Sequence, residues 1–106
     1  MKTPLNIVLD QIYQGLKNIY NQQLDQVVLY GSQARGDAEP DSDIDILIVL
    51  RQEFSYSKES NKISKLIANL SLEHDTLISC ALATRRQLED YNNSFFRNVR
   101  RDGIRL

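Results

Sequence analysis

Two aspartates stand two residues apart where an apolar segment of the chain begins. Asp43 and Asp45 flank an isoleucine and lead into the hydrophobic run of residues 46–50. Alternate residues of a β-strand point to the same face, so the two carboxylates are expected to lie side by side. Hard oxygen ligands in such a pair suit Mg²⁺ or Mn²⁺, above all where substrate phosphates complete the coordination shell. The spacing therefore predicts a divalent-cation site at the start of a strand.

The segment around the two aspartates is strongly acidic. Residues 37–45 hold five acidic residues and no basic one, directly before residues that belong in a core. A bound cation would convert the mutual repulsion of these carboxylates into attraction. A third carboxylate on a neighbouring strand would complete a two-metal site, and Asp75 stands at the expected start of such a strand. Asp43, Asp45 and Asp75 are therefore the predicted metal ligands and catalytic carboxylates.

A glycine–serine pair precedes the aspartates. Gly31 and Ser32 follow the short β-branched run of residues 26–30. A glycine lets a phosphate approach the backbone, and a serine at the start of a helical turn offers a hydroxyl and an amide. The chain lacks the P-loop pattern GxxxxGKS or GxxxxGKT, so this is a phosphate-binding turn of another kind. Such a turn followed by a metal-binding carboxylate pair is typical of phosphoryl or nucleotidyl transfer.

Other interpretations of the acidic segment explain less of it. An EF-hand loop beginning at Asp41 fails, because Ile46 stands where a glycine is needed and Gln52 where a glutamate is needed. The Arg-Gly-Asp tripeptide at residues 35–37 is an adhesion motif that recurs by chance. An Asx-rich turn before a strand explains an isolated Asp-x-Asp, but not its combination with the glycine–serine turn and a third aspartate.

The periodicity of apolar residues predicts helices and strands in alternation. Helical spacing indicates helices at about residues 3–20, with Thr3 as N-cap, and 57–72. Strand-like runs occupy residues 26–30, 43–50 and 74–83, with a loop and at most one helical turn at 32–42. Two short helices are expected at 84–91, capped by Thr84, and from residue 94 to Gly103. The order predicts an α/β (α+β) fold, a small mixed β-sheet flanked by helices.

The strand at residues 43–50 is apolar on both faces beyond its first residues. Ile44, Ile46 and Ile48 share one face, and Leu47 and Val49 share the other with the two aspartates. A strand of this kind is covered by helices on both sides. Only its first residues are expected to reach water, and those are the residues that carry the carboxylates.

Length and composition limit the possible classes of protein. The chain has 106 residues and is expected to form one domain, residues 1–106, with 42% hydrophobic and 25% charged residues. A net charge of −1 favours neither nucleic acid nor a membrane surface as a partner. The sequence shows no signal peptide and no apolar run of transmembrane length, so a cytoplasmic location is expected. Residues 85–106 hold six arginines and three acidic residues, which indicates either a binding surface for an acidic partner or a solvated helical face. The single cysteine, Cys80, is expected to be a buried structural thiol.

The segment GSQARGDAEPDSDIDILIV, residues 31–49, resembles the signature of the nucleotidyltransferases of the DNA polymerase β superfamily. Their pattern is Gly-Ser, then Arg-Gly, then Asp-x-Asp. The likeness is greatest to the minimal nucleotidyltransferases of bacteria and archaea, the antitoxin partners of HEPN toxins. SLEHDTLISCALAT resembles the third-carboxylate strand of that family and SFFRNVRRDGIRL its usual ending, so the resemblance covers nearly the whole chain.

The resemblance implies a role for each matching residue. Gly31 and Ser32 would bind the triphosphate of an NTP. Asp43 and Asp45 would ligate two Mg²⁺ ions, for which Mn²⁺ is a substitute. Asp75 would be the third ligand and a base for the acceptor hydroxyl, although Glu73 and His74 beside it leave this assignment open.

Arg35 matches the arginine of the family motif. It would either contact phosphate or brace the acidic loop through a salt bridge, and the salt bridge is favoured. His74, the single histidine, is expected at the surface near a strand entrance and not in catalysis.

The implied function is Mg²⁺-dependent transfer of NMP, most simply AMP from ATP, to a hydroxyl group. The implied acceptor is a tyrosine of a partner HEPN toxin, which would make the chain the antitoxin of a toxin–antitoxin pair. No second domain to hold an acceptor is expected in 106 residues, so a partner must supply acceptor binding. Two alternatives stay open: a non-catalytic module of the same fold that neutralises its partner by contact, and a small-molecule nucleotidyltransferase.

Overall fold

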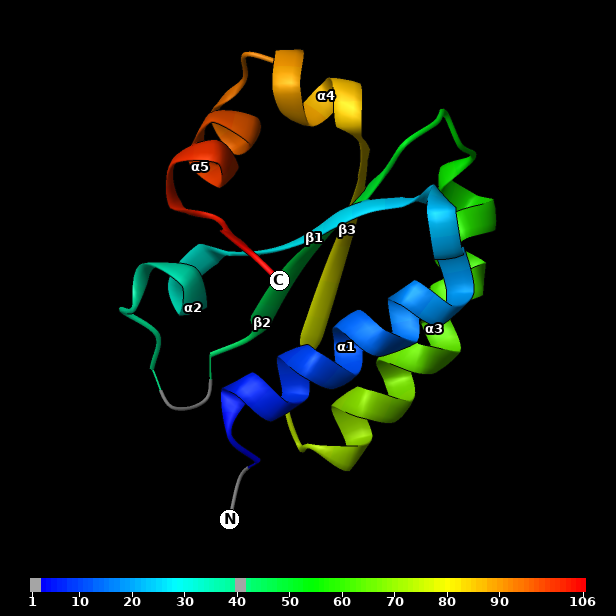
Figure 1. Ribbon diagram of the computed structural model, residues 1–106. Helices are drawn as coiled ribbons and strands as arrows, with labels where there is room; N and C mark the ends of the chain where they lie inside the picture. The colour runs from blue at the N-terminus through cyan, green and yellow to red at the C-terminus, as the bar shows by residue number, and fades with distance from the viewer. Residues whose placement is uncertain (1–2, 40–41) are drawn as a thin grey trace.

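Helices and strands alternate along the chain, as Figure 1 shows for the computed structural model, which describes residues 3–39 and 42–106. The elements in chain order are α1 (Leu5–Tyr20), the short turn η1 (Asn21–Gln23), β1 (Leu24–Tyr30), α2 (Gly31–Arg35), β2 (Ile44–Leu50), α3 (Tyr56–Glu73), β3 (Ile78–Thr84), α4 (Arg85–Asp90), α5 (Ser94–Asp102) and β4 (Ile104–Arg105).

The strands form one mixed sheet in the order β3-β2-β1-β4. β1 runs antiparallel to both β2 and β4, whereas β2 and β3 are parallel. A parallel pair needs a crossover connection, and α3 supplies it. These features confirm the predicted α/β architecture of a small mixed sheet flanked by helices.

Helices α1 and α3 lie side by side over one face of the sheet (Figure 1). α1 buries side chains at helical spacing, namely Val8, Ile12, Leu16 and Tyr20. Ile63 and Leu70 of α3 join the same core, which packs on Ile44, Ile46 and Ile48 of β2. Each fully buried side chain of this size stabilises the fold by about 1.5–3 kcal/mol.

Helices α4 and α5 cover part of the opposite face. Leu88, Phe96 and Val99 pack there against Val28, Leu47, Val49 and Ala83 of the sheet. α4 begins with a capping box, in which the Thr84 hydroxyl accepts the Gln87 N–H at 3.1 Å and the Gln87 side chain accepts the Thr84 N–H at 2.8 Å. Both the predicted cap and the predicted covering of β2 on its two faces are confirmed.

The end of α3 differs from the prediction. α3 extends to Glu73 and a turn follows, so β3 begins at Ile78 and not at residue 74. His74 is buried, and its Nδ1 and Nε2 atoms form hydrogen bonds with Thr3 Oγ1 at 2.8 Å and Gln11 Oε1 at 2.5 Å. The surface position predicted for His74 is therefore wrong, because the ring ties the end of α3 to α1.

Smaller differences concern the chain ends. Pro4 occupies the N-cap position of α1, and no side chain in the described part of the chain caps this helix, so the predicted Thr3 cap is wrong. The two-residue strand β4 was not predicted.

Cys80 is partly buried against the α1–α3 core, and burial raises the pKa of its thiol to about 12. None of the helices within residues 3–39 and 42–106 has the length and apolar character needed to cross a membrane.

Candidate active site

A tight helical turn follows β1, in the segment where the sequence predicted a loop with at most one helical turn. Gly31 opens α2 with a φ of 74°, a left-handed conformation that glycine adopts without strain. Gly36 ends the turn with a φ of 82°, and its N–H donates to the Ser32 carbonyl at 3.0 Å. Ser32 therefore lies in the first turn of α2, where backbone N–H groups have no intrahelical partner.

Strand β2 brings an aspartate against this turn. In the sheet register, Asp45 is paired with Tyr30, the residue that precedes Gly31. A Cβ atom built on Gly31 would overlap Oδ2 of Asp45. The predicted phosphate-binding turn and the predicted metal-binding carboxylate are therefore in contact, although they are separated along the chain.

The two aspartates differ in exposure and influence each other. Asp43 lies just before β2 and is exposed, whereas Asp45 is partly buried. Burial raises the pKa of Asp45 above its ordinary value, the charge of Asp43 raises it further, and the Arg35 guanidinium lowers it. The structure thus brings Asp43 and Asp45 together near the turn that holds Gly31, Ser32 and Arg35.

The carboxylate pair fits a hard divalent cation. Among the described residues, neither Asp43 nor Asp45 forms an ion pair with a lysine or arginine. Their repulsion is therefore not compensated by an ion pair with a basic side chain, and a cation between them would relieve it. Two carboxylates together with the phosphates of a nucleotide are a typical ligand set for Mg²⁺.

Asp75 lies apart from the sheet. It is exposed in the turn between α3 and β3, with a left-handed φ of 49°. No group of three or more His, Cys, Asp or Glu side chains within residues 3–39 and 42–106 is arranged to hold a metal ion. The structure therefore gathers Asp43 and Asp45, but not Asp75, into one cluster, and the role of Asp75 as third ligand stays a prediction.

Arg35 takes part in the salt bridge that the sequence favoured. Its Nε atom lies 3.2 Å from Oδ2 of Asp37, in the acidic loop, and both side chains are largely exposed. Arg35 also lines a cavity of about 240 Å³ next to Gly31, together with Tyr30, Phe95 and Asn98. Figure 1 shows α2 and α5, which frame it, close to the C-terminus. Sequence reasoning did not assign these three residues to the site, and only the position of Tyr30 directly before Gly31 could have indicated it.

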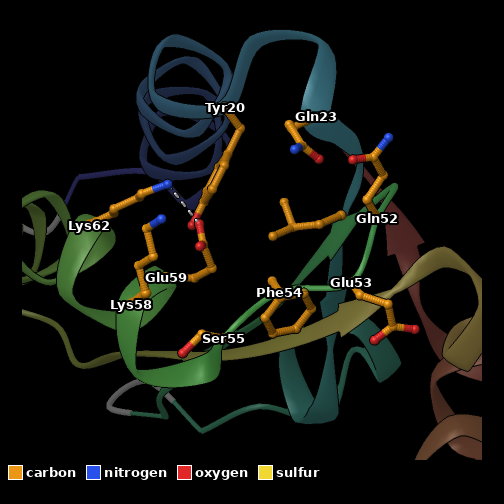
Figure 2. Close-up of a pocket in the computed structure, with 10 residues that line it drawn as sticks. Tyr20, Gln23, Gln52, Glu53, Phe54, Ser55, Lys58, Glu59 and Lys62 are labelled. Carbon is orange, nitrogen blue, oxygen red and sulfur yellow. Dashed lines mark ion pairs between the residues drawn. The ribbon is translucent and has the colours of Figure 1, made fainter.

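A second cavity, of about 330 Å³, lies at the other end of the sheet, near the last residue of β2 (Figure 2). Two of its charged groups form an ion pair, since Lys62 Nζ lies 3.2 Å from Glu59 Oε1. The Tyr20 side chain points toward Glu59, and burial together with this carboxylate raises the pKa of the Tyr20 hydroxyl. None of the predicted site residues lines this cavity.

The chain matches the family model of the nucleotidyltransferase domain over residues 9–102. Putative protein adenylyltransferase MJ0141 of Methanocaldococcus jannaschii is 39% identical over 72 residues, which are 68% of this chain and 72% of that protein. Putative protein adenylyltransferase MJ0604 of the same organism is 32% identical over 96 residues, which are 90% of each chain.

Solved structures share the fold. A putative nucleotidyltransferase from Sulfolobus solfataricus has a TM-score of 0.68 at 21% identity, over 92% of this chain and 75% of that one. A toxin–antitoxin structure with AMP-PNP has a TM-score of 0.60 at 20% identity, over 91% and 69%. A tri-AMPylated Shewanella oneidensis HEPN toxin in complex with MNT antitoxin gives 0.58 at 17% identity, over 94% and 69%. With its mixed sheet and its match over residues 9–102, the chain belongs to the nucleotidyltransferase domain family and is a nucleotidyltransferase.

Proposed function

We propose that this nucleotidyltransferase transfers AMP from ATP to a hydroxyl group of a partner protein in an Mg²⁺-dependent reaction. The observation that carries the proposal is the contact between Gly31 and Asp45. Because of this contact, a nucleotide bound by the turn at Gly31 would have its phosphates beside the carboxylate pair. Binding of phosphate and binding of a cation would then occur in one place.

In this proposal the residues of the turn bind and orient the triphosphate. Gly31 allows a phosphate to approach the backbone, and Ser32 offers its hydroxyl and an N–H group at the start of α2. Arg35 adds positive charge close to Asp45, as its effect on the pKa of that carboxyl indicates. Held in this way, the α-phosphorus would be fixed relative to an incoming hydroxyl, which is the main contribution of positioning to catalysis.

Asp43 and Asp45 would hold Mg²⁺, or Mn²⁺ in its place. The ion, when bound, stabilises negative charge on the entering and leaving oxygens of the transferred phosphoryl group. The acceptor hydroxyl would attack the α-phosphorus in line, forming a new P–O bond while the bond to pyrophosphate breaks and the hydroxyl proton passes to a base. The sequence assigns the role of this base to Asp75, and that assignment stays a prediction.

The comparisons support a protein as the acceptor. The two relatives from Methanocaldococcus jannaschii are named as protein adenylyltransferases. Two of the structural neighbours are toxin–antitoxin complexes, one of which contains a tri-AMPylated HEPN toxin. We therefore propose that the partner is a HEPN-type toxin, that the acceptor is one of its tyrosines, and that the chain acts as its antitoxin.

A transfer assay tests this function. The purified protein is incubated with Mg²⁺, each α-labelled NTP in turn and a candidate partner, the product of the neighbouring gene. Label is expected to move from ATP to the partner with the wild type and not with Asp43→Asn. Asp10→Asn is the matched control, because it makes the same change at an exposed position of α1. If the partner binds tightly but receives label from no NTP, the protein is a contact-only antitoxin and the proposal fails.

A further inference from the structure

Three side chains stand in one row across the sheet at the level of Asp45. Its partner in antiparallel β1 is Tyr30, and its partner in parallel β3 is Ser79. Paired residues of neighbouring strands lie about 5 Å apart and project from the same face of the sheet. Ser79 is therefore the nearest residue of β3 to the Asp45 carboxylate.

The packing of the following residues confirms the face on which Ser79 lies. Leu47 and Val49 are paired with Ala81 and Ala83, and all four belong to the core under α4 and α5. Side chains alternate along a strand, so Ser79 shares the face of Ala81, and Asp45 shares the face of Leu47. Ser79 is only partly buried, so the row remains accessible at this end of the sheet.

Asp75 does not occupy this place. The carbonyl of Leu77 accepts the N–H of Ile44, which places Leu77 level with the very start of β2. Asp75 precedes Leu77 by a further two residues and lies in the exposed turn. The β3 residue beside Asp45 thus carries a neutral hydroxyl, and the carboxylates available to a cation here are those of Asp43 and Asp45.

The charge of the ligand set decides how well such a site holds a cation. Oxygen sites bind divalent cations more tightly as the number of charged ligands increases, and Mg²⁺ with one or two carboxylates usually relies on substrate phosphates as well. We propose that Ser79 is the third side chain of the metal site, and that its neutrality makes cation binding depend on the phosphates of the nucleotide. The proposal rests on the proposed function, because it takes the phosphates of an NTP as the missing anionic ligands. The neutral Ser79 hydroxyl thus keeps the affinity of the site for the cation low until the nucleotide binds.

Binding of Mn²⁺ in the absence of nucleotide tests the proposal without any measurement of activity. The free ion gives an EPR signal that decreases when it binds to protein. Ser79→Asp adds a third carboxylate beside Asp45 and is expected to tighten Mn²⁺ binding at least about tenfold relative to the wild type. Ser64→Asp is the matched control, because it adds the same charge at an exposed position of α3 and is expected to leave the affinity within about twofold.

The variant Asp75→Asn tests whether Asp75 or Ser79 supplies the third side chain of the metal site. If Ser79 supplies it, Asp75→Asn binds Mn²⁺ as the wild type does, and Asp45→Asn loses binding. Loss of Mn²⁺ binding in Asp75→Asn, or no gain in a folded Ser79→Asp, would overturn the proposal. Circular dichroism checks folding, and Ser79→Glu supplies the same charge if Ser79→Asp does not fold.

Nucleotide binding distinguishes failure of this inference from failure of the proposed function. A fluorescent ATP analogue is expected to bind the wild type with Mn²⁺ present and at least about tenfold more weakly with EDTA. Equal binding in the two conditions would overturn the coupling proposed here. If the analogue binds in neither condition, the proposed function fails as well.

Discussion

Gly31 and Asp45 lie against each other, so that a side chain at position 31 would overlap the Oδ2 atom of Asp45. The same glycine has a φ of 74°, which side-chain-bearing residues rarely adopt. A side chain at position 31 would therefore have to displace the Asp45 carboxylate and also adopt a strained backbone conformation. The other left-handed glycine of the turn, Gly36, has a φ of 82°, but a Cβ atom at this position would meet no atom of the described residues within 4 Å.

This difference makes Gly31→Ala and Gly36→Ala a matched pair. Both substitutions introduce alanine at a positive φ and are expected to cost about 1–2 kcal/mol in the free energy of unfolding. Only Gly31→Ala also displaces the Asp45 carboxylate, so it is expected to lower the rate of nucleotidyl transfer at least about 100-fold. Urea unfolding and the transfer assay measure the two effects. Equal transfer rates in the two variants would show that the contact is not needed.

Asp45→Asn is expected to abolish transfer and yet stabilise the metal-free protein at neutral pH. Burial and the Asp43 charge raise the pKa of Asp45 in the folded state above its ordinary value of 3.8. The folded protein therefore favours the protonated form of Asp45. The contribution of this carboxyl to the free energy of unfolding is fully present below the unfolded pKa and is lost as the pH rises through the folded pKa. The variant is therefore expected to have a higher Tm than the wild type at about pH 7 and no such gain at about pH 3, both in EDTA. A lower Tm at pH 7 would contradict this explanation.

The Cys80 thiol is expected to be unreactive in the folded protein. Burial raises its pKa to about 12, from an ordinary value of 9.0. Because the thiolate is the reactive form, alkylation by iodoacetamide at about pH 8 is expected to be at least about 100-fold slower in the native protein than in urea. Mass spectrometry gives both rates. Fast labelling of the native protein would mean that β3 opens frequently.

His74→Ala is expected to destabilise the fold by about 2–3 kcal/mol, because it removes two side-chain hydrogen bonds and leaves their partners at a partly buried site. These bonds join His74 to Thr3 and Gln11. A double-mutant cycle with Gln11→Ala measures the coupling between α3 and α1, and additive effects would show that the His74–Gln11 bond contributes nothing.

The sequence was sufficient to predict the parts of the site that depend only on residues close together along the chain. The spacing of Asp43 and Asp45 determines that their side chains share a face, and Gly31-Ser32 follows a recognisable strand. The amphipathic patterns of α1 and α3 were likewise visible, because a helix that packs on a sheet repeats its apolar residues at a fixed spacing.

The residue that lies beside Asp45 on β3 depends on the register between β2 and β3, and no local sequence pattern predicts this register. The register of β3 follows from where α3 ends, and α3 continues to Glu73 because His74 is buried against α1. The hydroxyl of Ser71 then accepts the N–H of Ile78 at 3.3 Å, which fixes the start of the strand. A single histidine beside an aspartate gave no sign of these tertiary contacts, so the sequence placed the start of the strand too early.

Asp45 meets its two neighbours through connections of different length. Tyr30 reaches it across residues 31–44, whereas Ser79 reaches it only after the crossover formed by residues 51–77. Contacts between residues close in sequence lose less chain entropy and tend to form earlier in folding. We therefore expect the β1–β2 pair, with Gly31 against Asp45, to be present in the folding transition state, and β3 to dock later. Substitutions at Gly31 should then slow folding, whereas substitutions at Ser79 should mainly change the rate of unfolding.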